Sequence, residues 1–315
     1  MDVYCIGEII ADFLPGEAEN VYIRNFGGAP ANTAVACARN GLSSGLCCKV
    51  GDDDHGLFLE KTLKEENVEI LCKERCRDAV TTMSFVSLDK NGERSFAFAR
   101  RPGADMFLSP DDVKEEEIRN SLIVHAGSCS LSADLSAAAT KKAVFLGHKY
   151  GKIVSFDINY RDNMWNGEKG RCIQAIRKIL PKCDLLKISE EEAGMLGGEN
   201  SLPEILNENS LTAIVLTLGS AGARAYMRAK TLEEKGIKVC AADTTGAGDA
   251  FWGAFLSSLI IQNAKRREDL TENVLKKALE YGNISGALSV QSKGSISSLP
   301  ARAQIEKFLI EKSLN

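Results

Sequence analysis

The nine residues from Asp243 to Phe251 read DTTGAGDAF and carry the strongest local signal in this chain. They follow a strand-like run, Lys238–Ala242, and open an apolar helix of small residues that we expect over Ala247–Asn263. A glycine turn that enters a helix exposes free backbone N–H groups beside the positive end of the helix dipole, so it attracts phosphate. Glycine suits the turn because a side chain would block close approach of the ligand.

Asp249 is the unexpected residue of this turn. A carboxylate at this position repels a bound anion. The arrangement makes sense if Asp249 contacts a hydroxyl group of the substrate while the backbone amides hold the phosphoryl group, which that hydroxyl attacks. The alternative is an ordinary helix N-cap, a position that aspartate suits. The chain has no GxxxxGK[ST] segment and does not open with a strand–GxGxxG–helix unit. These absences argue against a Walker-type phosphate loop and a dinucleotide-binding fold.

A second glycine cluster lies near the N-terminus. Residues 27–32 read GGAPAN and precede the first expected helix, Ala31–Asn40. Asn32 would lie on the first turn of that helix, beside Asp12 at the end of the first strand. Together these two side chains offer the acceptors and donors that sugar hydroxyls require.

Short apolar runs alternate with longer amphipathic runs along the chain. This alternation is typical of βαβ units and predicts an α/β fold with a mostly parallel sheet. The expected strands are Val3–Ile10, Leu46–Val50, Ser121–His125, Ile153–Asp157, Leu185–Ile188 and Ala213–Thr217. The further expected helices are Gly56–Glu66, Ser132–Tyr150, Gly167–Leu180, Glu272–Val290 and Ala301–Lys312.

Two segments, at about 13–26 and 81–101, break this rhythm with alternating rather than helical patterns. The second reads as a hairpin because of its Asn91-Gly92 turn. We expect both to form a small β lid over one edge of the main sheet; a plain extension of that sheet is the alternative. No repeat, linker or composition shift divides the chain, so residues 1–315 are expected to form a single domain.

Composition excludes several classes of function. The 315 residues carry a net charge of −4 with scattered Lys and Arg, which leaves no electrostatic footprint for nucleic acid. No run approaches the roughly 18 apolar residues of a membrane span, and the N-terminus does not read as a signal peptide. The ten cysteines lie mostly in apolar runs and are expected to be reduced thiols of a cytoplasmic protein.

Two stretches resemble the signatures of the PfkB (ribokinase-like) carbohydrate kinases: Gly27 through Asn32 to Gly51, and Asp243 to Leu256. The resemblance includes Gly7-Glu8 and Asp12 at the start of the chain, and it extends to the nucleotide turn Thr217–Gly222. It implies a Rossmann-like α/β/α three-layer sandwich with a small β-sheet lid. It also implies ATP-dependent phosphorylation of a sugar hydroxyl.

The resemblance also implies roles for individual residues. Asp249 matches the catalytic base, and its anion hole would be formed by Gly246, Ala247 and Gly248. The nucleotide would be bound by Lys187, Ser189, Thr217, Gly219, Gly222 and Asn283. Glu192 would hold Mg2+ through water, and potassium would lie among Asp243, Thr245, Ser289, Ser292, Gly294 and Ser298. Lys187 could instead be a surface lysine, and residues 289–298 an ordinary loop.

Three segments resemble the fructokinase-like branch of the family, and they predict the sugar. They are residues 28–32, residues 100–106 and the Asp157-x-Asn159-x-Arg161 element. Substrate binding is then expected from Asp12, Gly27, Gly28, Asn32, Phe98, Arg100 and Arg161. Ala99 and Arg101 depart from the branch pattern on the lid, where substrates are chosen.

D-Fructose, giving fructose 6-phosphate, is the favoured substrate, and 2-keto-3-deoxygluconate is the alternative, toward which a cationic Arg101 would point. A catalytically silent sugar-binding or scaffolding relative is the alternative of a different class. The intact Gly246, Gly248 and Asp249 favour an enzyme. The partners expected are a sugar and a second copy bound through the lid, without nucleic acid or membrane.

Overall fold

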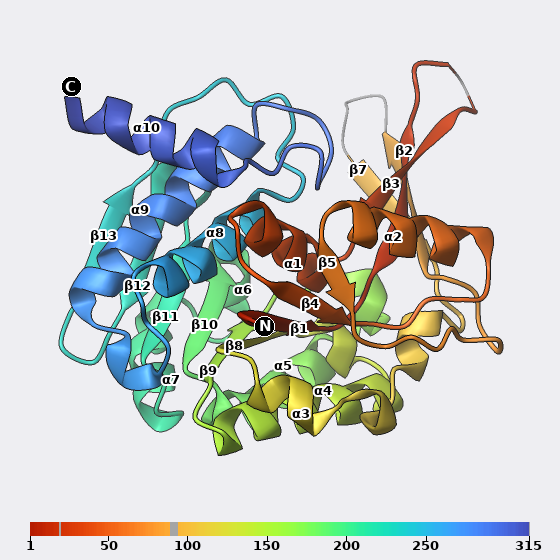
Figure 1. The fold of residues 1–315 in the computed structure, drawn as a ribbon, viewed down its shortest axis with the longest axis horizontal. Coiled ribbons are helices and arrows are strands. Elements are labelled where there is room, and N and C mark those ends of the chain that lie inside the picture. The colour runs from red at the N-terminus through yellow and green to blue at the C-terminus, as the bar shows by residue number, and fades with distance from the viewer. Residues whose placement is uncertain (19, 89–93, 315) are drawn as a thin grey trace.

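The computed structural model describes residues 1–18, 20–88 and 94–314, which form two sheets and flanking helices (Figure 1). The large sheet has the order β13-β12-β11-β10-β9-β8-β1-β4-β5. It is parallel except that β12 pairs antiparallel with both β11 and β13. Its strands are β1 Val3–Ile6, β4 Ser44–Cys47, β5 Val68–Ile70, β8 Ile123–Gly127, β9 Ile153–Asp157, β10 Leu185–Ser189, β11 Ala213–Thr217, β12 Gly222–Tyr226 and β13 Thr231–Lys235.

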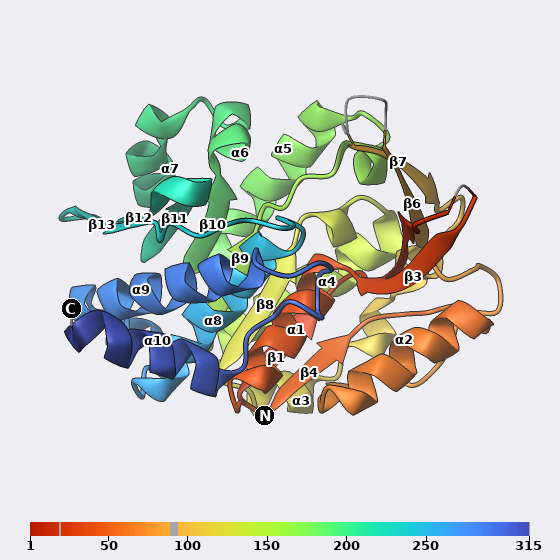
Figure 2. The same ribbon diagram turned by 90° about the horizontal axis from the view of Figure 1, so that it is seen from above.

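Helices cover both faces of this sheet, as Figure 2 shows from above. One layer holds α1 Ala29–Arg39, α2 Asp54–Glu65, α8 Ala247–Ile261, α9 Glu272–Ser289 and α10 Arg302–Leu314. The other holds α3 Glu115–Arg119, α4 Asp134–Lys149, α5 Lys169–Ile179, α6 Glu190–Met195 and α7 Leu202–Glu208. Because both faces are covered, the central strands are apolar along their whole length. In β1, Val3 and Cys5 join one core, and Tyr4 and Ile6 join the other. The expected α/β/α sandwich is confirmed.

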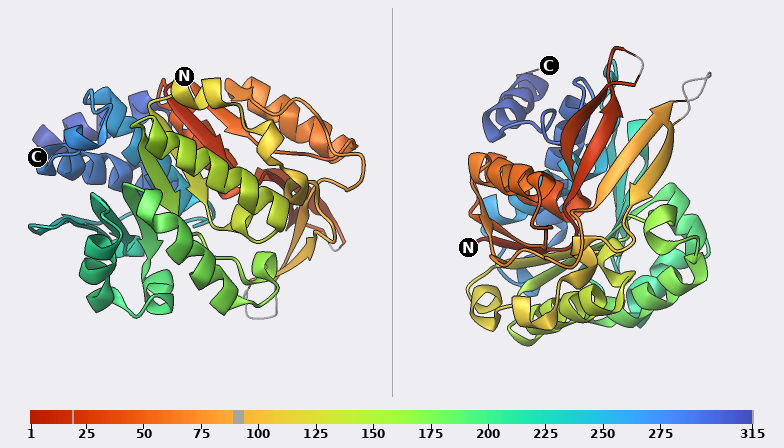
Figure 3. Two further views of the ribbon diagram at one scale, coloured as in Figure 1. Left: turned by 90° about the horizontal axis from the view of Figure 1, so that it is seen from below. Right: turned by 90° about the vertical axis from the view of Figure 1, so that its right-hand side faces the viewer.

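The smaller sheet has the order β3-β2-β6-β7 and stands off one side of the molecule (Figure 3). Its strands are β2 Ile10–Pro15, β3 Tyr22–Gly27, β6 Met83–Leu88 and β7 Arg94–Ala99. The pairing of β2 with β6 is parallel, and the other two pairings are antiparallel. The two segments with alternating patterns therefore form this sheet, while the expected Asn91-Gly92 turn lies outside the described residues.

Two expectations about strands were wrong. Val3–Ile10 is not one strand, because the chain leaves the large sheet at Gly7, whose φ is 149°, and enters the smaller sheet at Ile10. Lys238–Ala242 forms no strand, since its residues are exposed or half-buried and pair with no strand in the described part of the chain. Instead, the N–H groups of Ala242 and Asp243 donate to Val290 O at 2.7 and 3.1 Å.

Two further features concern membrane-spanning helices and the cysteine thiols. Across the described residues, we find no helix whose length and apolar character would let it traverse a bilayer. All ten cysteines are free, and nine of them are buried; Cys240 is exposed, on the irregular segment before Asp243.

Candidate active site

A cavity of about 560 Å³ lies between the smaller sheet and the carboxyl ends of the large-sheet strands. The smaller sheet contributes Asp12, Ser84 and Phe98 to its wall. The N-terminal turns of α1 and α8 contribute Asn32 and Asp249. Further lining residues are Glu8, Gly28, Cys129, Asn159, Arg161, Asp162, Lys187, Glu191, Thr245, Gly246, Gly248 and Ser295. The two glycine clusters of the sequence thus meet in one place.

Asp249 and Asn32, which are 217 residues apart, share a hydrogen bond in this cavity. Asn32 Nδ2 donates to Asp249 Oδ2 at 2.7 Å. The helices that carry them approach closely at Gly253, where a Cβ would lie 2.4 Å from the Cβ of Ala36. Burial raises the pKa of Asp249 to about 6, although Lys187 and the hydrogen bond from Asn32 oppose this rise. A carboxyl with such a pKa can take up a proton near neutral pH.

The turn before Asp249 has the geometry of an anion site. Gly246 is the N-cap of α8, with a φ of 77°, and no side chain caps the helix there. The N-cap interpretation of Asp249 was therefore wrong, because this residue lies inside the first turn. A Cβ on Gly246 would lie 3.2 Å from the Cα of Ser295, so the turn also packs tightly against the loop that follows α9. The N–H of Ala247 donates to Thr244 O at 3.3 Å, so the next amides of the first turn, on Gly248 and Asp249, are the ones left to a ligand.

Lys187 is a buried cation at the same end of the cavity. Its Nζ donates to Asp157 Oδ2 at 2.7 Å, and a Cβ on Gly248 would lie 3.4 Å from Nζ. The alternative of a surface lysine was wrong, since only 7% of its side chain is exposed. The Oδ1 atom of Asp157 has no hydrogen-bond partner among the described residues. The pair therefore presents both a charge for a phosphoryl group and a free carboxylate oxygen.

Asp12 lies opposite, on β2. It accepts a hydrogen bond from Ser84 Oγ, and burial raises its pKa to about 6. A Cβ on Gly27 would lie 2.0 Å from Asp12 Oδ2, so glycine at 27 makes room for this carboxyl. Gly28 has a φ of 106° and lies against Glu8 O, where no side chain fits. The structure brings these predicted residues together with Asn32 and Phe98.

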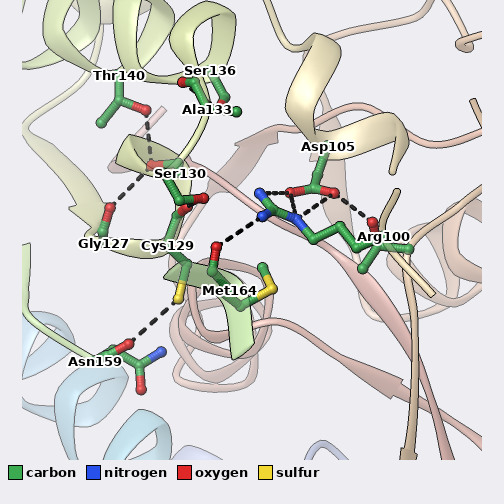
Figure 4. Close-up of polar contacts among 12 residues, drawn as sticks. Arg100, Asp105, Gly127, Cys129, Ser130, Ala133, Ser136, Thr140, Asn159 and Met164 are labelled. Atoms are coloured by element: carbon green, nitrogen blue, oxygen red, sulfur yellow. Dashed lines mark hydrogen bonds and ion pairs between the residues drawn. The ribbon is translucent and has the colours of Figure 1, made fainter. Parts of the chain in front are cut away.

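Arg100 requires a correction. Its guanidinium forms a buried ion pair with Asp105, with Nη2 2.7 Å from Oδ2, and its Nη1 donates to Met164 O at 3.1 Å (Figure 4). It is not among the residues that line the cavity. The charge expected to contact the sugar is thus neutralised within the turn that follows β7. Arg161, in contrast, is exposed and lines the cavity.

Several lining residues were not predicted, namely Glu8, Ser84, Cys129 and Ser295. Glu8 is the one with a visible signal, because a glutamate at the end of an apolar run must either be paired or face a polar site. Ser84 and Ser295 look like ordinary strand and loop residues in the sequence. Their positions depend on the pairing of β6 with β2 and on a hydrogen bond from Ser295 Oγ to Phe26 O of 2.5 Å.

Of the predicted nucleotide residues, Lys187 lines this cavity and the others are not among its lining residues. Thr217 ends β11, and Gly219 and Gly222 shape the turn into β12. Gly222 has a φ of 110°, and a Cβ there would lie 2.1 Å from Glu234 O. Asn283 Nδ2 donates to Glu234 O at 3.0 Å, so α9 is tied to β13 at this turn.

Ser189 and Glu192 form a capping box at the start of α6. Glu192 Oε2 accepts from Ser189 N and its Oε1 from Tyr160 N, both at 2.8 Å. A carboxyl group whose two oxygens each accept from a backbone amide is fixed in orientation, which suits a hydrated Mg2+ better than direct ligation. Asp157 and Glu192 both interact electrostatically with Lys187, so two carboxyl groups lie near the cation expected to contact the phosphates, and this set fits a hydrated ion.

The predicted potassium residues fall on two adjoining segments. Asp243 Oδ2 accepts from Gly294 N at 3.1 Å, and Asp243 Oδ1 accepts from Thr245 Oγ1 at 2.7 Å. The hydroxyl of Ser289 donates to Gly286 O within α9, and that of Ser298 donates to Ser295 O in the loop that follows. Ser292 lines a different hollow, beside Arg39. Asp243, Thr245 and Gly294 thus lie together, and their oxygens fit a monovalent cation beside the anion turn.

Comparisons with known proteins agree with this site. The sequence model described as "pfkB family carbohydrate kinase" matches residues 2–302. The chain is 34% identical to "Probable fructokinase-2" of Arabidopsis thaliana, covering 98% of this chain and 95% of that protein. It is also 34% identical to "Fructokinase-1" of Zea mays, with 99% and 98% covered.

Solved structures show the same likeness. A fructokinase from Xylella fastidiosa with bound ATP superposes with a TM-score of 0.90 at 30% identity, covering 99% of both chains. A fructokinase from Vibrio cholerae with fructose, ADP and calcium bound gives a TM-score of 0.88 at 31% identity, covering 98% of both. An aminoimidazole riboside kinase from Salmonella enterica gives 0.86 at 27%, covering 98% of this chain and 100% of that chain.

Proposed function

The chain belongs to the pfkB family of carbohydrate kinases, and from this premise we propose that it transfers the γ-phosphoryl group of ATP to D-fructose, giving fructose 6-phosphate and ADP. The family makes the protein an ATP-dependent sugar kinase. Support for fructose comes from the plant fructokinases at 34% identity and from the fructose-bound Vibrio structure.

The observation that carries the proposal is the Asp249–Asn32 hydrogen bond at the glycine turn. Asp249 would take the proton of the sugar hydroxyl while the hydroxyl oxygen bonds to the γ-phosphorus. The bond from that phosphorus to the bridging oxygen breaks, and ADP leaves with the electron pair. The N–H groups of Gly248 and Asp249 would stabilise the charge on the transferred group. Asn32 holds the carboxyl oriented toward the acceptor.

The charge of the cavity favours a neutral sugar over a sugar acid. Five carboxyls, on Glu8, Asp12, Asp162, Glu191 and Asp249, line the wall and outnumber its two cations, Arg161 and Lys187. Of the two lid arginines, Arg100 is neutralised by Asp105, and Arg101 is exposed and not among the lining residues. Carboxyls accept hydrogen bonds from hydroxyls but repel a carboxylate. This wall therefore disfavours 2-keto-3-deoxygluconate.

The remaining roles follow from the same proposal. Bound Mg2+ would neutralise the nucleotide phosphates; Glu192 would orient its water shell and Lys187 would contact the phosphates. A potassium ion would be held beside Asp243. The smaller sheet would act as a lid of a single-domain enzyme, and β3, an edge strand with exposed Val21, Tyr22 and Ile23 in or beside it, would pair two copies. The free thiols support a cytoplasmic location.

A coupled ADP-release assay over a sugar panel tests the proposal. The panel holds D-fructose, D-ribose, D-glucose and 2-keto-3-deoxygluconate, each with ATP, Mg2+ and K+. We expect the highest kcat/KM with D-fructose, and conversion of the product by phosphoglucose isomerase would identify the 6-phosphate. Asp249→Asn should lower kcat by about 10²–10⁴-fold, while Asp111→Asn, at an exposed carboxylate outside the cavity, should not. Near-normal turnover by Asp249→Asn, or a preference for the sugar acid, would refute the assignment.

A further inference from the structure

Glu8 is a buried carboxyl in the wall of the sugar cavity that no step of the proposed reaction uses. Its side chain lies where the chain passes from β1 to β2, and only 4% of the residue is exposed. It lines the cavity that also holds Asp12, Asn32 and Asp249. Its Oε2 atom has no hydrogen-bond partner among residues 1–18, 20–88 and 94–314.

An unpartnered carboxyl oxygen at such a position is costly, because burial removes its water without supplying a donor. Asp12 in the same wall is satisfied by Ser84, and Asp249 by Asn32. Arg100, which interacts with Glu8 electrostatically, has its guanidinium bound to Asp105 and Met164 O. Among the described residues, the wall of the sugar cavity thus holds two buried acceptors without a donor, Glu8 Oε2 and Asn32 Oδ1, and Glu8 Oε2 is the one that belongs to a carboxyl.

A hydroxyl group of the substrate is the donor that fits this oxygen. We propose that Glu8 is a sugar-binding residue whose Oε2 accepts a hydrogen bond from one hydroxyl of the acceptor sugar other than the one that is phosphorylated. The inference rests on the proposed function, since the cavity must bind a polyol. It adds a third carboxyl to Asp12 and Asp249 as a group that contacts the sugar, and this one lies on the segment between the two sheets rather than on the lid.

The electrostatic setting agrees with this role. Burial raises the pKa of Glu8 to about 7, with Asp105 and Asp249 adding to the rise and Arg100 opposing it. Near neutral pH the carboxyl can therefore accept a hydrogen bond or donate one. An anionic group of a ligand would meet this carboxyl as well as Asp12 and Asp249, so Glu8 also acts against sugar acids.

The test is a set of kinetic measurements with D-fructose and its monodeoxy analogues. In the wild type, one of the deoxyfructoses should have a kcat/KM about 10- to 100-fold below that of fructose, because it lacks the hydroxyl that donates to Glu8. This is the usual effect of losing a hydrogen bond to a charged group. In Glu8→Ala, KM for fructose should rise by a similar factor, and that same analogue should react within about threefold of fructose. KM for ATP should stay within about twofold. Glu8→Gln, which keeps an acceptor oxygen, should lie between the two enzymes.

A matched control is Glu117, whose Oε2 also lacks a partner among the described residues but lies outside the cavity. Glu117→Ala and Glu117→Gln should leave KM for fructose unchanged. The inference is overturned if Glu8→Ala and Glu8→Gln keep the wild-type KM for fructose. It is also overturned if each deoxy analogue shows the same loss of kcat/KM, relative to fructose, in the wild type and in both variants. If Glu8→Ala gives no cooperative unfolding transition, Glu8→Gln decides by the same criteria.

The two proposals fail differently. If the wild type ignores fructose but phosphorylates another sugar of the panel, the proposed substrate is wrong. The deoxy analogues of that other sugar then test Glu8 in the same way. If fructose is the substrate and no analogue distinguishes Glu8→Ala from the wild type, the role of Glu8 is wrong and the proposed function stands.

Discussion

Two opposing effects set the pKa of the Asp249 carboxyl group. Burial disfavours the carboxylate and raises its pKa, while the Lys187 cation and the Asn32 amide favour the charged form. Asp157 raises the pKa again, although it also neutralises Lys187 at 2.7 Å. A base that deprotonates an alcohol must be ionised before the reaction and must accept a proton during it. A pKa of about 6 satisfies both conditions at neutral pH.

The pH dependence of kcat/KM should therefore show an acidic limb. Because the base must be ionised, activity is present above the pKa of about 6 and falls as pH drops through it. Asn32→Ala removes a hydrogen bond that lowers this pKa, so the limb should move to higher pH. Since Asp12 and Glu8 titrate in the same cavity, the limb reports apparent pKa values. A displacement of the limb in Asn32→Ala would assign it to Asp249.

The measurement is kcat/KM for fructose between pH 5 and pH 9 in the wild type and in Asn32→Ala. Asn120→Ala, at an exposed asparagine at the end of α3, is the control and should keep the wild-type profile. An unmoved limb in Asn32→Ala, or a limb that moves to lower pH, would contradict the role given to this hydrogen bond.

At the scale of elements, the start of α6 connects two strand ends. Ser189 ends β10 and caps α6, while Glu192 reaches across to the Tyr160 amide that follows β9. α6 spans only Glu190–Met195, so its own hydrogen bonds contribute little and the capping box matters more. The capping box therefore fixes both the helix and the carboxylate expected to orient the metal's water.

Two substitutions separate these roles. Ser189→Ala should cost about 1 kcal/mol in the free energy of unfolding, the usual effect of losing an N-cap. Glu192→Gln should raise the Mg2+ concentration for half-maximal activity, because the negative charge is lost. Urea unfolding and a magnesium titration measure the two effects. Glu190→Gln, two residues before Glu192 and exposed, should change neither the unfolding free energy nor the Mg2+ requirement. If Glu190→Gln raised the Mg2+ requirement as much as Glu192→Gln, only the general negative charge of this helix start would matter.

The elements also show what a sequence can predict. Ile153–Asp157 and Ala213–Thr217 were correct to the residue because central parallel strands are apolar throughout. β12 and β13, at one end of the large sheet, were missed because strands of mixed polarity carry no such pattern. Asn32 and Asp249 were placed correctly by their motifs, whereas Arg100 was not. A motif fixes local geometry, but the Asp105 partner depends on how the turn after β7 folds back.

For the whole molecule, the smaller sheet has two different sides. Toward the large sheet it supplies Asp12, Ser84 and Phe98 to the cavity. Its β3 edge is tied down by Ser295, which donates to Phe26 O, and by Arg24, whose guanidinium lies 4.2 Å from the ring centre of Phe58 on α2. Farther along the same edge, β3 has no neighbouring strand among the residues that the structure describes, and Val21, Tyr22 and Ile23 are exposed. An edge of this kind is a template for pairing with another chain.

We therefore expect the enzyme to be a dimer in which β3 of one copy lies against β3 of the other. Ile23→Asp places a charge on this apolar edge and should give a monomer by light scattering at micromolar concentration. Phe145→Asp on α4 is the matched control, because Phe145 is 53% exposed and Ile23 is 54% exposed. Since β3 carries the Asn25 and Phe26 that precede Gly27, the monomeric variant should also show a higher KM for fructose, with KM for ATP unchanged. A wild type that is monomeric at these concentrations would refute the pairing, as would a Phe145→Asp variant that dissociates equally well.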